Sequence, residues 1–130
     1  FVWVRLAFGK LAAAIATIDT IEEERLVAKA AQSGELLKEG LDMFVDKYEH
    51  VTEVRGKGLM LGLVLDQPVK PLLEAMRNIG LLGLAAGENV LRLLPPLNVK
   101  DDELEEALDM LDDALAEIHG TSEEAATTEG

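Results

Sequence analysis

The sequence predicts an α+β fold in which a small, mostly antiparallel sheet packs against helices. Both ends of the chain show helical periodicity, and the middle holds short apolar runs bounded by glycine and proline. With 130 residues, 48% of them hydrophobic, the chain is long enough to bury one core and too short for several domains. It contains no cysteine, which excludes disulfides, cysteine-ligated zinc and cysteine nucleophiles.

Two helices are expected in the first third of the chain. Over 11–30 the apolar residues recur near one helical face, and the three glutamates at 22–24 fall on the solvated side. Ser33 and Gly34 interrupt this pattern. Apolar residues resume at helical spacing over about 34–48, which predicts either a second helix or the second half of one kinked helix.

The middle of the chain predicts short strands separated by a helix. Each apolar run ends at glycines or prolines, which terminate regular structure. Pro68 and Pro71 suit a helix start and Gly80 suits a helix end, so one helix is expected between them. The strands are expected at 51–54, 59–65, 81–84 and 90–94, with a turn at 85–89.

A leucine stripe predicts the last helix. Leucine or isoleucine recurs at intervals of four, three, four and three residues from Leu104 to Ile118, with acidic residues on the other faces. Asp102 and Glu105 have a spacing like that of a capping box, which would satisfy free backbone N–H groups where the helix begins.

Composition predicts the domain organisation and excludes some partners. Residues 1–10 form an atypical start, 11–120 form the domain, and 121–130 form a disordered acidic tail. Of the formal net charge of −13, residues 101–130 carry −12. This balance argues against a nucleic-acid or anionic-membrane binder, which needs a basic surface. No apolar run approaches the roughly 20 residues of a membrane span, and a cytoplasmic protein is expected.

Most residues that could carry chemistry have a structural interpretation. His50 and His119 stand at expected helix ends, where a histidine interacts with the helix dipole, and neither has a neighbour at metal-ligand spacing. The acidic cluster at 101–113 is interpreted as a solvated helix face. The Arg-Gly-Lys-Gly segment at 55–58 matches no phosphate-binding glycine motif and is interpreted as a tight turn before a strand. No catalytic residue or metal site is predicted.

Arg92 is the one residue that this reasoning leaves open. It lies within the apolar run 90–94, and a buried arginine is costly unless an acceptor meets it. One interpretation is a structural ion pair with an internal acid such as Glu88 or Asp66. The other is that the planar guanidinium binds a substrate carboxylate through two parallel hydrogen bonds. The residue pattern alone favours neither.

Three sequence segments resemble those of the class-III pyridoxal-phosphate aminotransferases, and most closely those of the acetylornithine type. They are Ile-Glu-Glu-Glu at 21–24, Val-Arg-Gly-Lys-Gly-Leu-Met-Leu-Gly at 54–62, and Ala-Ala-Gly-Glu-Asn-Val-Leu-Arg-Leu-Leu-Pro-Pro-Leu at 85–97, which is the most specific. The resemblance covers about 11–118 and includes the acidic helix. That family has a large cofactor-binding domain and a small C-terminal α+β domain, and the resemblance implies that this chain corresponds to the small one.

The resemblance also implies a function. Arg92 would bind the substrate α-carboxylate while an amino group passes from N-acetylornithine to 2-oxoglutarate. Pyridoxal 5′-phosphate is implied for the full-length enzyme, but its lysine lies upstream of the resembling region, so the chain alone is expected to bind no cofactor and to be inactive. The alternative is a stand-alone, non-catalytic interaction or assembly module. In it, residues 1–8 either cover the apolar surface that a large domain would otherwise meet or pair two chains into a homodimer.

Overall fold

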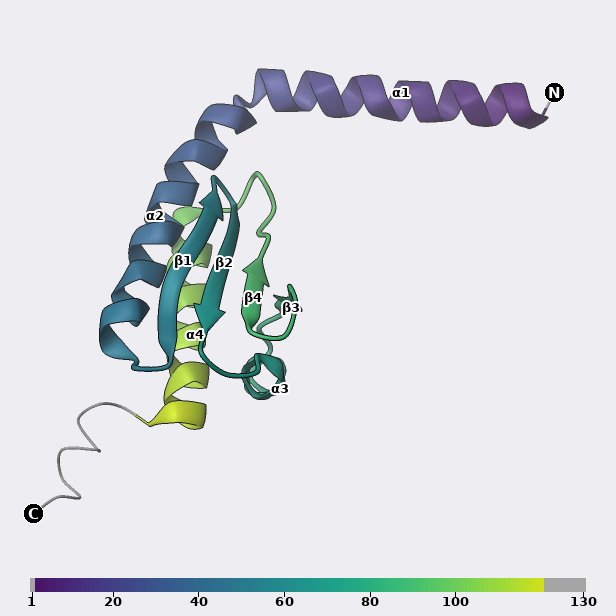
Figure 1. Cartoon of the computed structure of the whole chain (residues 1–130). Coiled ribbons are helices and arrows are strands. Elements are labelled where there is room, and N and C mark those ends of the chain that lie inside the picture. The colour runs from purple at the N-terminus through teal and green to yellow at the C-terminus, as the bar shows by residue number, and fades with distance from the viewer. Residues whose placement is uncertain (1, 121–130) are drawn as a thin grey trace, which may run out of the picture.

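A computed structural model of the chain describes residues 2–120, so the tail expected at 121–130 lies outside the described residues. Four helices and four short strands follow one another (Figure 1). In chain order they are α1 (Val2–Glu23), α2 (Leu26–Lys47), β1 (Val51–Lys57), β2 (Met60–Leu65), α3 (Lys70–Asn78), β3 (Leu84–Ala85), β4 (Val90–Leu93) and α4 (Asp101–His119).

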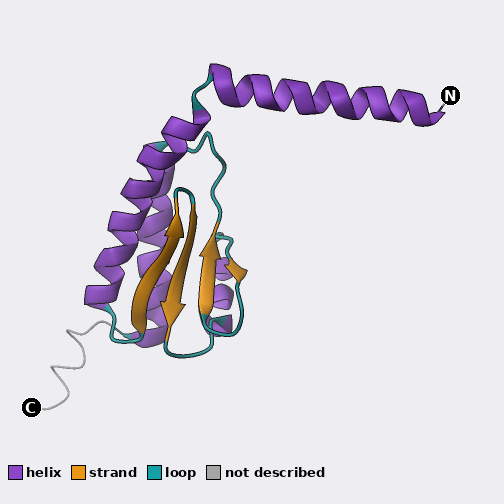
Figure 2. Ribbon diagram, turned by 45° about the horizontal axis from the view of Figure 1, so that its top comes forward, coloured by secondary structure: helices purple, strands orange, loops and turns teal. Residues whose placement is uncertain are grey.

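The strands form one antiparallel sheet in the order β1-β2-β4-β3. Figures 1 and 2 show α2 and α4 on one side of this sheet, and α3 packs against α4. The opposite face of the sheet is not covered by any described helix. The α+β fold and the element order expected from the sequence are therefore confirmed.

The alternation of side chains along β2 separates a buried face from an open one. Leu61, Leu63 and Leu65 are at most 2% exposed and point into the core, because successive strand residues face opposite sides of the sheet. Burying one leucine completely contributes about 1.5–3 kcal/mol relative to leaving it in water. Met60 lies on the other face and is exposed. The core therefore lies between the sheet and the helices.

The break between the first two helices lies elsewhere than expected. Arg25 takes the left-handed conformation, with φ of 52°, and separates α1 from α2. Ser33 and Gly34, expected to interrupt the helix, are instead buried inside α2. A Cβ on Gly34 would lie 2.5 Å from the backbone carbonyl of Gly58. The glycine is thus required by close helix-to-turn packing, and it does not end the helix.

Helix α1 projects away from the rest of the fold (Figure 1). It runs from Val2 to Glu23 without a break at residue 10, where the sequence predicted a boundary. Four apolar side chains spaced three, four and three residues apart are each more than half exposed along it: Phe8, Leu11, Ile15 and Ile18. This stripe has no partner among the described residues. No helix in the described part is both long and apolar enough to cross a membrane.

Two smaller expectations are corrected. The strand expected at 81–84 is only the two-residue β3, because just Leu84 and Ala85 reach pairing distance of β4. The cap of α4 forms two residues earlier than the capping-box spacing suggested. There the backbone N–H of Lys100 donates to the carboxylate of Glu103 over 2.9 Å, since α4 begins at Asp101.

A buried tyrosine joins the end of α2 to α4. Tyr48 is 2% exposed, and its hydroxyl donates to Asp112 Oδ1 over 2.6 Å. Lys47 Nζ donates to the same carboxylate over 2.7 and 2.8 Å. Burial alone would raise the pKa of Asp112, but the hydrogen bonds from Lys47 and Tyr48 outweigh it and hold that pKa below its ordinary value.

Asp112→Asn is expected to lower the free energy of unfolding by about 1 kcal/mol at pH 7, because it removes a partly exposed charged hydrogen-bond acceptor. A carboxyl with a lowered folded pKa stabilises above its unfolded pKa, about 3.9, and loses this effect as pH falls through the folded value. Urea denaturation should therefore show the difference from wild type shrinking below about pH 4. Asp109→Asn, an exposed carboxylate on the same helix, is the control. Equal losses in both variants would contradict the prediction.

Candidate functional site

Arg92 lies on the open face of the sheet, which corrects the expectation that it is buried. On β4 it stands directly opposite Gly62 of β2 and Leu84 of β3. Its neighbour Leu91 is fully buried, whereas Arg92 itself is exposed. Strand alternation explains the difference, since Leu91 and Arg92 must face opposite sides of the sheet.

The structural interpretation of Arg92 as half of an internal ion pair is wrong. Asp66 lies 3.0 Å from His50 Nδ1 instead, and Glu88 is exposed beyond the start of β4. Among the ion pairs in the part of the chain that the structure describes, none includes Arg92. Its guanidinium therefore faces outward and is available to an external carboxylate.

Gly62 is the residue next to Arg92 in the sheet. It lies between Arg55 of β1 and Arg92 of β4 in one row across the sheet. A Cβ at Gly62 would lie 3.0 Å from Cγ1 of Val90, so a larger residue would crowd the side chain of Val90. The glycine therefore leaves room for Val90 and adds no side chain of its own beside the Arg92 guanidinium.

The open face is more basic than the chain as a whole. Arg55, Lys57 and Arg92 all occupy its outward register positions, against the single acid Glu53. Glu53 forms an ion pair with Arg55 through Nε, whereas Lys57 and Arg92 form no ion pair among the described residues. In a chain of net charge −13, the excess of basic side chains on this face favours an anion.

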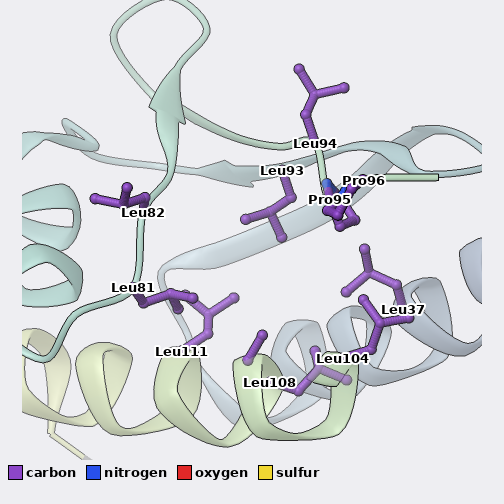
Figure 3. Close-up of a pocket in the computed structure, with 11 residues that line it drawn as sticks. Leu37, Leu81, Leu82, Leu93, Leu94, Pro95, Pro96, Leu104, Leu108 and Leu111 are labelled. Carbon is purple, nitrogen blue, oxygen red and sulfur yellow. The ribbon is translucent and has the colours of Figure 1, made fainter. Parts of the chain in front are cut away.

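One hollow in the fold is lined by apolar side chains only. It has a volume of about 290 Å³ and lies where the end of β4 meets α4 (Figure 3). Leu93 points from β4 towards Leu108 and Leu111 of α4, and Pro95 and Pro96 close one end. No lining side chain carries a charge or a hydrogen-bonding group, so this hollow offers nothing to orient a polar substrate.

The two histidines lie together, which the sequence did not indicate. Their ring centroids are 4.9 Å apart. His50 lies beyond the end of α2 and contacts Asp66, so its interpretation as a histidine at a helix terminus is wrong. Across the described residues, no group of three or more histidine, aspartate or glutamate side chains is arranged to hold a metal ion.

A match to a known family defines the class of protein. Residues 9–115 match the family model described as Aminotransferase class-III, which is most of the chain. The chain therefore belongs to the class-III aminotransferase family, whose members depend on pyridoxal phosphate.

Within this family the chain is similar to acetylornithine and ornithine aminotransferases. The acetylornithine aminotransferase of Bacillus subtilis (strain 168) is 43% identical over 106 residues, which are 82% of this chain and 27% of the relative. An ornithine aminotransferase of Bacillus cereus (strain Q1) is 37% identical over 105 residues, 81% of this chain and 26% of the relative. The chain thus spans little more than a quarter of the length of these relatives.

The fold of this chain is also similar to part of solved acetylornithine aminotransferase structures. Acetylornithine aminotransferase from Elizabethkingia anophelis superposes with a TM-score of 0.76 at 27% identity, over 80% of this chain and 27% of that one. The N-acetylornithine aminotransferase from Stenotrophomonas maltophilia K279a superposes with a TM-score of 0.71 at 34% identity, over 83% of this chain and 31% of that one.

The lysines that line hollows can be compared with what pyridoxal phosphate needs. An enzyme holds this cofactor with a lysine for its aldehyde, a partner for its ring nitrogen and a phosphate site. Lys47 and Asp112 line one hollow, and Lys70 and Glu88 line another. The acidic side chain in each hollow disfavours a phosphate group nearby. These two hollows are therefore poorly suited to the phosphate of the cofactor.

Proposed function

We propose that this chain is the small, substrate-binding domain of a cytoplasmic acetylornithine-type aminotransferase. The whole enzyme transfers an amino group from N-acetylornithine to 2-oxoglutarate, and pyridoxal phosphate, held by the rest of the enzyme, supplies the electronic chemistry. The observation that carries the proposal is the position of Arg92. It lies exposed on the open sheet face opposite Gly62, without an acidic partner among the described residues.

Arg92 would bind and orient both substrates in turn. The amino donor and the 2-oxo acid acceptor each carry a carboxylate next to the reacting carbon, so one guanidinium serves both. The planar guanidinium forms two parallel hydrogen bonds with a carboxylate, which fixes the direction of the substrate as well as its position. β4 holds the arginine through pairs with β2 on one side and β3 on the other.

A chimera tests the proposal. Residues 9–115 of this chain replace the matching segment of the Bacillus subtilis acetylornithine aminotransferase, which is 43% identical. The chimera is expected to bind pyridoxal phosphate through the Bacillus portion and to transfer the amino group of N-acetylornithine to 2-oxoglutarate. A chimera that folds, binds the cofactor and shows no turnover would contradict the proposal.

The second candidate, a non-catalytic assembly module, is favoured by one observation. The apolar stripe of α1 is more than half exposed from Phe8 to Ile18, and exposed apolar surfaces of this kind promote association. Phe8 is the residue of the pairing surface expected at 1–8 that is known to belong to this stripe. Self-association of the 130-residue chain in sedimentation, together with an inactive chimera, would favour the module over the aminotransferase domain.

A further inference from the structure

We propose that His50 and His119 form a pH-sensitive clasp that holds the last turn of α4 to the sheet and opens when both rings are protonated. The clasp consists of His50, Asp66, Gln67 and His119. The two rings lie with centroids 4.9 Å apart and planes at 42°. His50 Nδ1 lies 3.0 Å from Asp66 Oδ1, and Gln67 Nε2 lies 2.7 Å from His119 Nδ1. The proposal is independent of the aminotransferase function.

One half of the clasp is fixed by the backbone, and the other half is not. The N–H of Asp66 donates to the carbonyl of His50 over 3.0 Å, next to the pair Val51–Leu65 of β1 and β2. His119 is the last residue of α4, and its recorded polar side-chain contact is the one with Gln67. Ala116 and Ile118 also pack against the core, so loss of the ring contacts would loosen the helix end without detaching it and would leave the strands paired.

The charges around the clasp accommodate one proton better than two. The charged groups that act on His119 are His50, from the turn before β1, and Asp66, from the loop after β2. Helix α3 brings no charge to it among the described residues, and Lys47 of α2 pairs instead with Asp112. Within residues 2–120, one carboxylate therefore faces two imidazoles. When both are protonated, two positive rings lie side by side with a single negative charge, and like charges at this separation repel.

The pKa of His119 is shifted in the direction that acid-induced opening requires. Burial lowers the pKa of His119, the charge of His50 lowers it further, and Asp66 acts in the opposite direction. A lowered folded pKa means that the released form takes up the proton at a higher pH than the closed form. The clasp therefore stabilises the fold fully above the ordinary histidine value of about 6.5, and this contribution is lost as pH falls through the folded pKa.

Amide hydrogen exchange measured by NMR tests the clasp. The chain contains only two histidines, so His50→Gln/His119→Gln removes all imidazole titration. After correction for intrinsic exchange rates, the wild-type amides at 116–119 are expected to lose about twofold or more of their protection between pH 7.5 and pH 5.5, with EDTA present. The double variant is expected to show no such loss at the same positions.

A third variant tests the role of charge. Asp66→Asn removes the carboxylate that faces the rings in the described part of the chain, so the acid-induced loss of protection is expected to be larger than in wild type. Asp109→Asn, on the exposed face of α4, is the matched control and is expected to behave as wild type. Unchanged wild-type protection, an equal loss in the double variant, or a smaller loss in Asp66→Asn would overturn the proposal. A pH dependence seen only without EDTA would overturn it in favour of metal binding.

Discussion

Replacing Arg92 by glutamine in the chimera is expected to lower kcat/KM for N-acetylornithine by about 10²- to 10³-fold. Losing one partner of a hydrogen-bonded charge pair costs about 2–5 kcal/mol, and each 1.4 kcal/mol corresponds to tenfold. Arg92→Lys keeps the charge but loses the two parallel hydrogen bonds, so an intermediate loss is expected. Steady-state kinetics with each substrate varied in turn provide the measurement.

The matched control is Arg77→Gln, which removes an exposed arginine on α3, away from the open sheet face. It is expected to leave kcat/KM unchanged. Because Arg92 is exposed and makes no ion pair among the described residues, Arg92→Gln is expected to change the free energy of unfolding by no more than about 0.5 kcal/mol. If Arg92→Gln lowers kcat/KM for the amino donor but leaves kcat/KM for the 2-oxo acid unchanged, the two substrates do not share this carboxylate site.

The sequence singled out Arg92 as a candidate but suggested that it is buried. Val90 and Leu94 share its outward side, so the strand is apolar on both faces and resembles a fully buried one. The open face carries several exposed apolar side chains, among them Met60 and Leu84. The strand therefore shows no alternation of polar and apolar residues from which its two faces could be predicted. The pairing register shows which way the guanidinium points.

The order of the elements could be predicted because each depends on nearby residues, whereas contacts between distant segments could not. Helical stripes, apolar runs and terminating glycines are local signals. His50 and His119 meet only because α4 ends beside the turn that enters β1. No spacing in the sequence encodes that approach. The same holds for Tyr48 and Asp112, whose hydrogen bond depends on how α2 and α4 pack.

The helix break expected at Ser33 and Gly34 was wrong for the same reason, because the role of Gly34 depends on a contact with a distant segment. A glycine inside a helical pattern is ambiguous, because it can end the helix or permit a close approach. Here it permits α2 to pack directly on the backbone of Gly58 in the turn between β1 and β2. The helix actually breaks at Arg25, a residue whose type gives no warning of a left-handed conformation.

Gly34→Ala is consequently expected to lower the free energy of unfolding by about 2–4 kcal/mol, because overpacking against a rigid neighbour forces the backbone to move. Its new Cβ would lie 2.5 Å from both the carbonyl carbon and the oxygen of Gly58. Neither atom can rotate away. The gain in helix propensity from alanine, about 1 kcal/mol, offsets only part of this cost.

Two other helical glycines provide the comparison in urea denaturation. A Cβ on Gly40 would lie 2.3 Å from Cδ1 of Leu108, the end of a flexible side chain, so Gly40→Ala is expected to cost less than Gly34→Ala. A Cβ on Gly9 would meet nothing within 4 Å, so Gly9→Ala is expected to cause no loss of stability and to increase helicity slightly. If Gly34→Ala lowers the free energy of unfolding no more than Gly9→Ala does, α2 does not pack as closely on Gly58 as described.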